Sequence, residues 1–138
     1  MTCYDEVPET VTDRYCQDLA DFVQTLRNEG RQVVICTAWK AFSPEQDWAT
    51  QQRAAQLFLL IQPELSLKGL HDAFAKFNAA VRQVAATTDT PCLDLAKQIP
   101  ADPDLFRDPT HLNAHGRALA AQLFADQLGP LIVAEGAD

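Results

Sequence analysis

The spacing of apolar residues along the chain predicts several amphipathic helices. In the segment PETVTDRYCQDLADFVQTLRNEG, apolar residues recur with the period of a helix and define a single face. The residues of this face are Tyr15, Leu19, Phe22, Val23 and Leu26. Gly30 follows directly and is suited to the left-handed conformation that ends many helices. We therefore expect the first helix to stop there.

Three more helices are expected further along the chain. SPEQ at 43–46 is typical of a helix start, with Ser43 as the cap and Gln46 reaching back, and the helix should end before Pro63. A third helix fits LKGLHDAFAKFNAAVRQVAA. A fourth begins near Leu112. The apolar residues expected to point inward from these last two helices are Leu70, Phe74, Phe77, Val81, Val84, Leu119, Leu123 and Leu128.

Two short apolar runs predict strands. RQVVICTAW predicts a buried strand over residues 32–37, and TPCLDLA predicts another over residues 92–95. Strands that alternate with helices favour parallel βα units, with helices on both faces of the sheet. Two parallel strands are a poor core by themselves, because each needs a neighbour on its other edge. The pattern therefore predicts the C-terminal portion of a larger α/β domain over residues 1–138, with its N-terminal strands missing.

Composition narrows the possible partners. The chain has 138 residues, of which 47% are hydrophobic and 22% charged, as in a globular protein. Its formal charge of −8 opposes binding to nucleic acid or to anionic membrane surfaces. No apolar run approaches ~18 residues, so no spanning helix is expected.

The cysteines and the first residues favour a cytoplasmic protein. Four cysteines are scattered without a C-x-x-C pair, at Cys3, Cys16, Cys36 and Cys92. This spacing predicts small buried thiols rather than a disulfide framework or a zinc site. The opening MTCYDEVPET has neither the basic nor the apolar region of a secretory signal.

The candidate chemistry lies in FRDPTHLNAHG, residues 106–116. An Asp three residues before a His can accept the imidazole Nδ1–H, which fixes the tautomer and stabilises the imidazolium. We therefore consider Asp108 and His111 as a catalytic pair. Three residues would support them: Thr110 by bracing the turn, Asn113 by capping the helix, and Gly116 by allowing close packing.

Simpler interpretations of the same residues stay open. Asp108 and Asn113 are also ordinary turn and capping residues, and His111 could be a polar loop residue. His111 and His115 form H-x-x-x-H, yet no H-E-x-x-H or nearby Cys or Glu completes a metal site, so we expect none. His115 is then a surface residue on the first helical turn.

The longer string DLFRDPTHLNAHGRALAAQLFADQL resembles the last block of the SGNH/GDSL hydrolase family, D-x-x-H-[LP]-N-x-x-G followed by an Ala/Leu-rich helix. Five residues match it position by position: Asp108, His111, Leu112, Asn113 and Gly116. YCQDLADFVQTLRNEGRQVVICTAW and FNAAVRQVAATTDTPCLDLA resemble the family's preceding helix–strand segments. The resemblance covers most of residues 15–128.

This resemblance implies a partial three-layer α/β/α, flavodoxin-like sandwich. His111 would be the general base and acid of a serine esterase, and Asp108 its orienting partner. The substrate would be a small-molecule acyl ester, and the chemistry would need neither metal nor organic cofactor.

The chain departs from the family at its N-terminal side. The G-D-S block with the nucleophile and the G-x-N-D block are absent. Ser43 and Ser66 are explained as helix-start residues, and nothing near Cys3 marks it as a substitute nucleophile. The chain alone should therefore be almost inactive. Its unpaired sheet edge invites self-association.

A second function remains open: a non-catalytic binding module derived from a hydrolase. Three further residues have structural interpretations beside functional ones. Trp39 could line an acyl pocket or cover the core, Asp94 could line the site or make a turn, and His71 is expected to be solvated.

Overall fold

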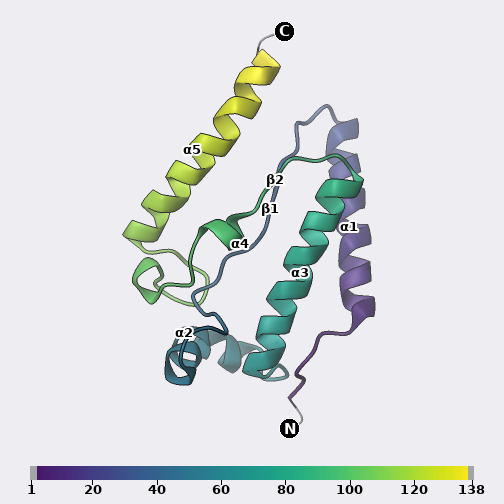
Figure 1. Cartoon of the computed structure of the whole chain (residues 1–138). Coiled ribbons are helices and arrows are strands. Elements are labelled where there is room, and N and C mark those ends of the chain that lie inside the picture. The colour runs from purple at the N-terminus through teal and green to yellow at the C-terminus, as the bar shows by residue number, and fades with distance from the viewer. Residues whose placement is uncertain (1–2, 137–138) are drawn as a thin grey trace.

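The structure is a computed structural model that describes the backbone of residues 3–136 and the side chains of residues 3–132. Its elements in chain order are α1 (Glu9–Asn28), β1 (Ile35–Cys36), α2 (Trp48–Ile61), α3 (Leu67–Thr87), β2 (Cys92–Leu93), α4 (Leu95–Gln98), the 3-10 turn η1 (Pro103–Leu105) and α5 (Ala114–Gly136). The two strands lie in the middle, with α1 and α3 on one side, α5 on the other and α2 below (Figure 1).

The predicted three-layer α/β/α sandwich is wrong. Helix accounts for 62% of the structure, and the sheet within residues 3–136 is one parallel pair of two-residue strands. The register joins Ile35 to Cys92 and Cys36 to Leu93. β2 begins at the predicted residue, whereas β1 begins three residues later than predicted. Both strands also end early, because β1 has no neighbour on its other edge within residues 3–136 to extend the ladder. Packing between helices and loops therefore replaces a sheet as the basis of the fold.

The end of α1 follows its sequence closely. Gly30 has a φ of 75°. The Gly30 N–H donates to the carbonyl of Arg27 (2.9 Å), and the Arg31 N–H donates to the carbonyl of Leu26 (3.0 Å). These bonds form a Schellman motif, which satisfies carbonyls at the helix end. The predicted stop is confirmed. Phe22 does not face the core as predicted, because its side chain is 59% exposed.

Helix α1 packs along α3 and is joined to it by a contact between aromatic rings and by hydrogen bonds at its C-terminal end. The rings of Tyr15 and Phe77 meet edge to face, with centroids 4.9 Å apart. Arg27 donates to the carbonyls of Thr88 (2.6 Å) and Asp89 (3.0 Å), which joins the end of α1 to the turn after α3. The buried residues of α3 are Leu67, Gly69, Leu70, Asn78, Ala80, Val81, Val84 and Ala85. We call the side formed by α1 and α3 the closed side of the molecule, because the inner face of α3 is covered.

Helix α2 begins four residues later than the sequence predicts. Asp47, not Ser43, is its cap, because the Asp47 carboxylate accepts from the Thr50 N–H (3.0 Å). Ser43 and Gln46 instead form a turn in which the Gln46 side chain accepts from the Ser43 N–H (2.9 Å). The predicted contact between the Gln46 side chain and the Ser43 backbone is therefore present, but it lies in a loop before α2.

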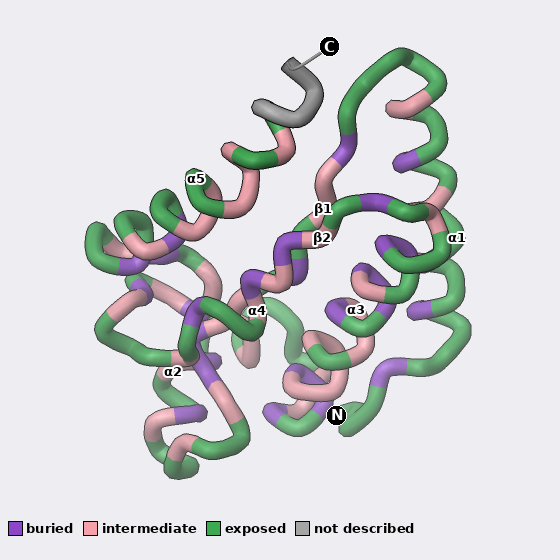
Figure 2. The backbone as a smooth tube through the Cα atoms, turned by 45° about the horizontal axis from the view of Figure 1, so that its top comes forward, coloured by how far each residue is buried: buried purple, intermediate pink, exposed green. Residues whose placement is uncertain are grey.

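Helix α5 lies on an open side of the molecule. Within residues 114–132 only Gly116 and Ala120 are buried, while Leu119, Leu123 and Leu128 are half-buried. Figure 2 shows α5 mostly exposed, on the opposite side of the strands from the more buried α3. Across residues 3–136, no helix is both long and apolar enough to cross a membrane.

Candidate functional site

The segment from Phe106 to Asn113 forms a tight loop between η1 and α5. Phe106 and Leu112 pair across the loop as an antiparallel bridge, and both are 8% exposed. The N–H of Arg107 donates to the carbonyl of His111 (2.8 Å), and that of Asn113 to Leu105 (2.9 Å). The apolar ends of the loop are thus fixed in the core, whereas Arg107 and His111 are exposed.

Residues after β1 hold the tip of this loop in place. The Trp39 indole donates to the carbonyl of Thr110 (2.8 Å), and the Ala41 N–H donates to that of Pro109 (2.9 Å). Trp39 is half-buried. Its polar edge therefore anchors the loop, a role that its position in the sequence did not suggest.

Asp108 holds the imidazole of His111 through both carboxylate oxygens. The Nδ1 atom lies 2.8 Å from Oδ2 and 2.9 Å from Oδ1. Oδ1 also accepts from the backbone N–H groups of Thr110 (3.1 Å) and His111 (2.9 Å). Partial burial opposes ionisation of Asp108, but these N–H groups and the imidazole outweigh it and lower its pKa. Asp108 is therefore a carboxylate that accepts from three N–H groups, two on the backbone and one on the imidazole.

This arrangement decides the tautomer of His111. A carboxylate can only accept, so the proton of a neutral imidazole lies on Nδ1 and the lone pair on Nε2. The His111 side chain is 68% exposed, and no group in the described part of the chain bonds to Nε2. The expected Asp–His bond is present, and the catalytic role remains a prediction.

The supporting residues occupy positions that explain their identities. Asn113 caps α5: its Oδ1 accepts from the Gly116 N–H (3.0 Å), and its Nδ2 donates to the carbonyl of Asp104 (2.6 Å). A Cβ on Gly116 would collide with the carbonyl of Leu105. Thr110 contributes through its backbone, as donor to Asp108 and acceptor from Trp39.

The possible nucleophiles of the chain lie elsewhere. Ser43 bonds to the carboxylate of Glu45. Ser66 caps α3 and donates to Asp5 (2.5 Å), and the thiol of Cys3 faces the carbonyl of Pro63 (3.5 Å). For residues 3–132, no hydroxyl or thiol forms a hydrogen bond with His111. Within the described side chains, the Asp108–His111 pair therefore has no hydroxyl or thiol beside it.

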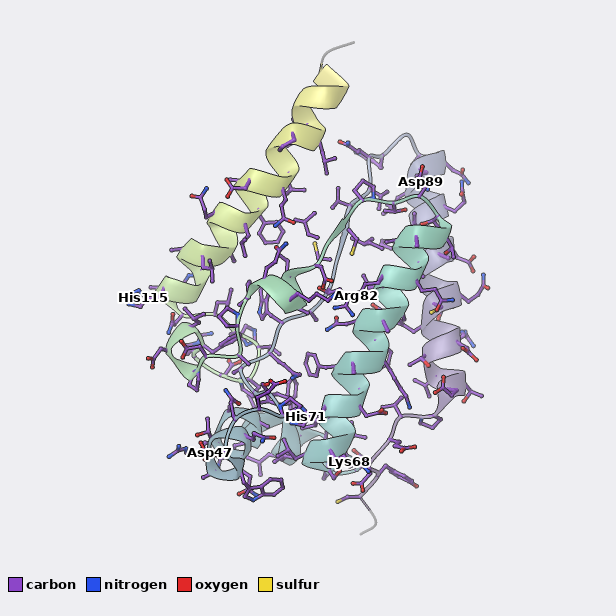
Figure 3. The ribbon with its side chains drawn as sticks, viewed as in Figure 1. Asp47, Lys68, His71, Arg82, Asp89 and His115 are labelled. Carbon is purple, nitrogen blue, oxygen red and sulfur yellow. The ribbon has the colours of Figure 1, made fainter. Side chains whose placement is uncertain are left out.

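His115 lies on the first turn of α5 and points outward (Figure 3). It is exposed. The part of the chain that the structure describes contains no cluster of three or more His, Cys, Asp or Glu residues able to hold a metal ion.

A pocket of about 460 Å³ opens beside Asp108. Its apolar wall comes from α2 and from the loops at either end of the site, through Ala41, Ala54, Leu57 and Phe106. Arg53 and Arg107 line it as well. A pocket of this size and lining can receive a small acyl chain next to the Asp–His pair.

Asp94, between β2 and α4, forms a polar cluster with Arg82 of α3 and Thr37 after β1. It accepts two bonds from the Arg82 guanidinium, both 2.8 Å, and one from Thr37 Oγ1 (2.9 Å). The Arg82 hydrogen bonds, together with that of Thr37, overcome partial burial and lower the pKa of Asp94 to about 2. Arg82 was not singled out from the sequence, although it lies on the same helical face as His71 and Asn78.

The prediction that His71 is solvated is wrong. Its ring meets the Phe42 ring at 5.3 Å between centroids, and its Nε2 lies 2.9 Å from Gln51 Oε1. Gln51 directs its NH₂ group to the carbonyl of Gln46 (2.6 Å), so Oε1 faces His71 and Nε2 carries the proton. The acceptor Nδ1 is buried and has no hydrogen-bond partner among residues 3–132. Burial, and next the charge of Lys40, lower the pKa of His71, so the ring is neutral.

Comparisons with protein-family models, with curated proteins and with solved structures found no match to this chain.

Proposed function

We propose that the chain supplies the His–Asp part of an SGNH/GDSL-type serine esterase that hydrolyses small acyl esters. The observation that supports this most is the Asp108–His111 pair, in which the carboxylate holds Nδ1 and leaves Nε2 free. The nucleophilic serine would come from a polypeptide segment outside residues 1–138. The resemblance of residues 108–116 to the family's last block provides the second support.

The geometry suits proton transfer in both directions. Nε2 of His111 accepts the proton of the serine hydroxyl as its oxygen attacks the ester carbonyl, and Asp108 stabilises the resulting imidazolium. The imidazolium then returns the proton to the departing alkoxide. Water repeats the cycle on the acyl-enzyme, giving a carboxylic acid and the free serine. The pocket lined by Leu57 and Phe106 would receive the acyl chain.

We would place a segment that carries the serine on the open side of the molecule. Ile35 and Thr37 direct their N–H groups to β2 (3.0 and 3.1 Å), so the N–H of Cys36 points to the opposite edge. Beside that edge lies an apolar pocket of about 250 Å³, lined by Trp39 and Phe124 among others. Thr110 of the catalytic loop also lines it. A strand added there would contact the loop that carries Asp108 and His111.

The same edge supports a second candidate function, a non-catalytic binding module that includes self-association. A strand edge with free N–H and C=O groups pairs readily with another chain. Sedimentation velocity tests this: concentration-dependent dimers that Cys36→Pro abolishes would support edge pairing. Monomers at all concentrations would exclude self-association through this edge.

The free thiols support a cytoplasmic location as part of the proposal. Cys36 and Cys92 lie on adjacent strands, and burial raises the pKa of both thiols. All four cysteines are free, as is usual in a reducing compartment.

The proposed function is tested by hydrolysis of p-nitrophenyl acetate. The chain alone should give a slow reaction, because general base catalysis contributes only about 10²–10⁴-fold. His111→Ala should remove the protein-dependent rate, and Asp108→Ala should lower it. His115→Ala is the matched control and should leave it unchanged. Equal rates in the unaltered chain and the His111→Ala variant would contradict the proposal.

A further inference from the structure

A second pocket, of about 380 Å³, lies on the other side of the segment that follows β1. Helix α3 supplies one wall with a single face, because its lining residues recur at intervals of three or four. These residues are His71, Phe74, Ala75, Asn78 and Arg82. Figure 3 shows His71 and Arg82 on this face of α3. Trp39 and Ile99 add apolar surface opposite.

The pocket is unusually rich in positive charge for this chain. Lys40, Arg82 and Lys97 line it, in a protein whose formal charge is −8. Asp94 pairs with Arg82 (2.8 Å) and Lys97 (3.4 Å), and Glu45 lies at the wall. Three cations against two carboxylates leave one positive charge in excess.

Lys40 is the cation that lacks a carboxylate partner. Its ammonium donates to the carbonyl of Phe42 (2.5 Å) and lies over the rings of Phe42 (4.8 Å) and Phe74 (5.8 Å). None of the ion pairs among residues 3–132 includes it. Burial lowers the pKa of Lys40, although Glu45 opposes this. An anion bound against this half-buried ammonium would offset part of the cost of removing its charge from water.

The other groups around Lys40 are fixed, which makes the pocket preformed. Asn78 accepts from the Ala38 N–H (2.7 Å) and donates to the Ala38 carbonyl (2.9 Å), which holds the backbone two residues before Lys40. Arg82 is held in place by its two bonds to Asp94. A preformed pocket loses little entropy when it binds a ligand.

We infer that this pocket binds a small organic monoanion, a carboxylate borne on an apolar body, with Lys40 as its main charged contact. One excess positive charge matches one carboxylate. The apolar walls from Trp39, Phe74 and Ile99 match the body of the ligand. This site is separate from the Asp108–His111 pair and does not depend on the proposed esterase function.

Benzoate titration, followed by NMR of the His71 imidazole and by calorimetry, tests the inference. Benzoate should bind saturably and shift the His71 ring signals, whereas neutral benzyl alcohol should bind much more weakly. Lys40→Met keeps the aliphatic stem but removes the charge, and should weaken benzoate binding about tenfold or more. Lys68→Met is the matched control, because Lys68 lies on α3 with its side chain 70% exposed and outside the pocket. It should bind benzoate as the unaltered chain does.

A second variant keeps the test decisive if Lys40→Met does not fold. Lys97 is 71% exposed, so Lys97→Met should fold and weaken benzoate binding severalfold. Three results would overturn the inference: no saturable binding of benzoate, equal affinity for benzyl alcohol, or equal losses in Lys40→Met and Lys68→Met. Binding of inorganic phosphate in preference to benzoate would also overturn it, because the apolar body would then contribute nothing.

Discussion

The two sides of this molecule differ in how completely their helices are covered. On one side α3 buries eight residues, of which Leu67 and Leu70 pack with Phe42 and with Ala55 of α2, and Arg27 joins the end of α1 to the turn after α3. On the other side α5, although longer, buries only Gly116 and Ala120 within residues 114–132. Apolar composition is therefore not enough to bury a helix, since a partner surface must exist. The Asp108–His111 pair lies at the start of the uncovered helix.

The largest expected effect comes from a matched pair of leucines on the two sides. Leu70 of α3 is 3% exposed, whereas Leu128 of α5 is half-buried. Leu70→Ala should lower the free energy of unfolding by about 2–5 kcal/mol, and Leu128→Ala by about 1 kcal/mol or less. Urea denaturation measures both. Equal losses would show that α5 is as well packed as α3.

Two glycines of α5 test which part of this helix packs against the rest of the protein. A Cβ on Gly116 would meet the carbonyl of Leu105, whereas a Cβ on Gly129 meets nothing within 4 Å. Gly116→Ala should therefore cost about 1–3 kcal/mol of unfolding free energy, as overpacking does. Gly129→Ala should change the free energy of unfolding by only about 0.5 kcal/mol or less, because Pro130 restricts the residue before it and offsets the helix preference of alanine. Thermal melting should show a clear loss only in Gly116→Ala; equal losses in both would mean that the second half of α5 is also packed.

Acid should lower the free energy of unfolding by protonating the Asp94 carboxylate, which pairs with Arg82 of α3. Its folded pKa of about 2 lies below the ordinary 3.8, so folding favours the carboxylate. The stabilisation is present above the ordinary pKa and disappears as the pH falls toward about 2. It amounts to roughly 2 kcal/mol. Urea unfolding between these pH values measures it, with Asp94→Asn as control: an unchanged pH dependence in the variant would rule out this carboxylate as the cause.

Local features of the fold were predictable from the sequence, because neighbouring residues form them. The stop at Gly30 and the cap at Asn113 depend on bonds within five residues. The bond between Asp108 and His111 also closes within a short loop. Each of these could be inferred from spacing alone.

Features that depend on distant partners were not predictable. The strands are shorter than expected, because β1 pairs only with β2 within residues 3–136. His71 was expected in solvent, but Phe42 and Gln51 from another part of the chain cover it. The three-layer sandwich was expected from two apolar runs, but in the described residues these form only one pair of two-residue strands, and helices pack directly on helices and loops.

The tautomer of His111 tests the central claim most directly. Nitrogen-15 NMR of the imidazole, recorded at a pH where the ring is neutral, distinguishes a proton on Nδ1 from one on Nε2. The account predicts the proton on Nδ1 in the unaltered chain and loss of this preference in Asp108→Ala. A proton on Nε2 in the unaltered chain would contradict it, since that nitrogen could then accept no proton from a serine.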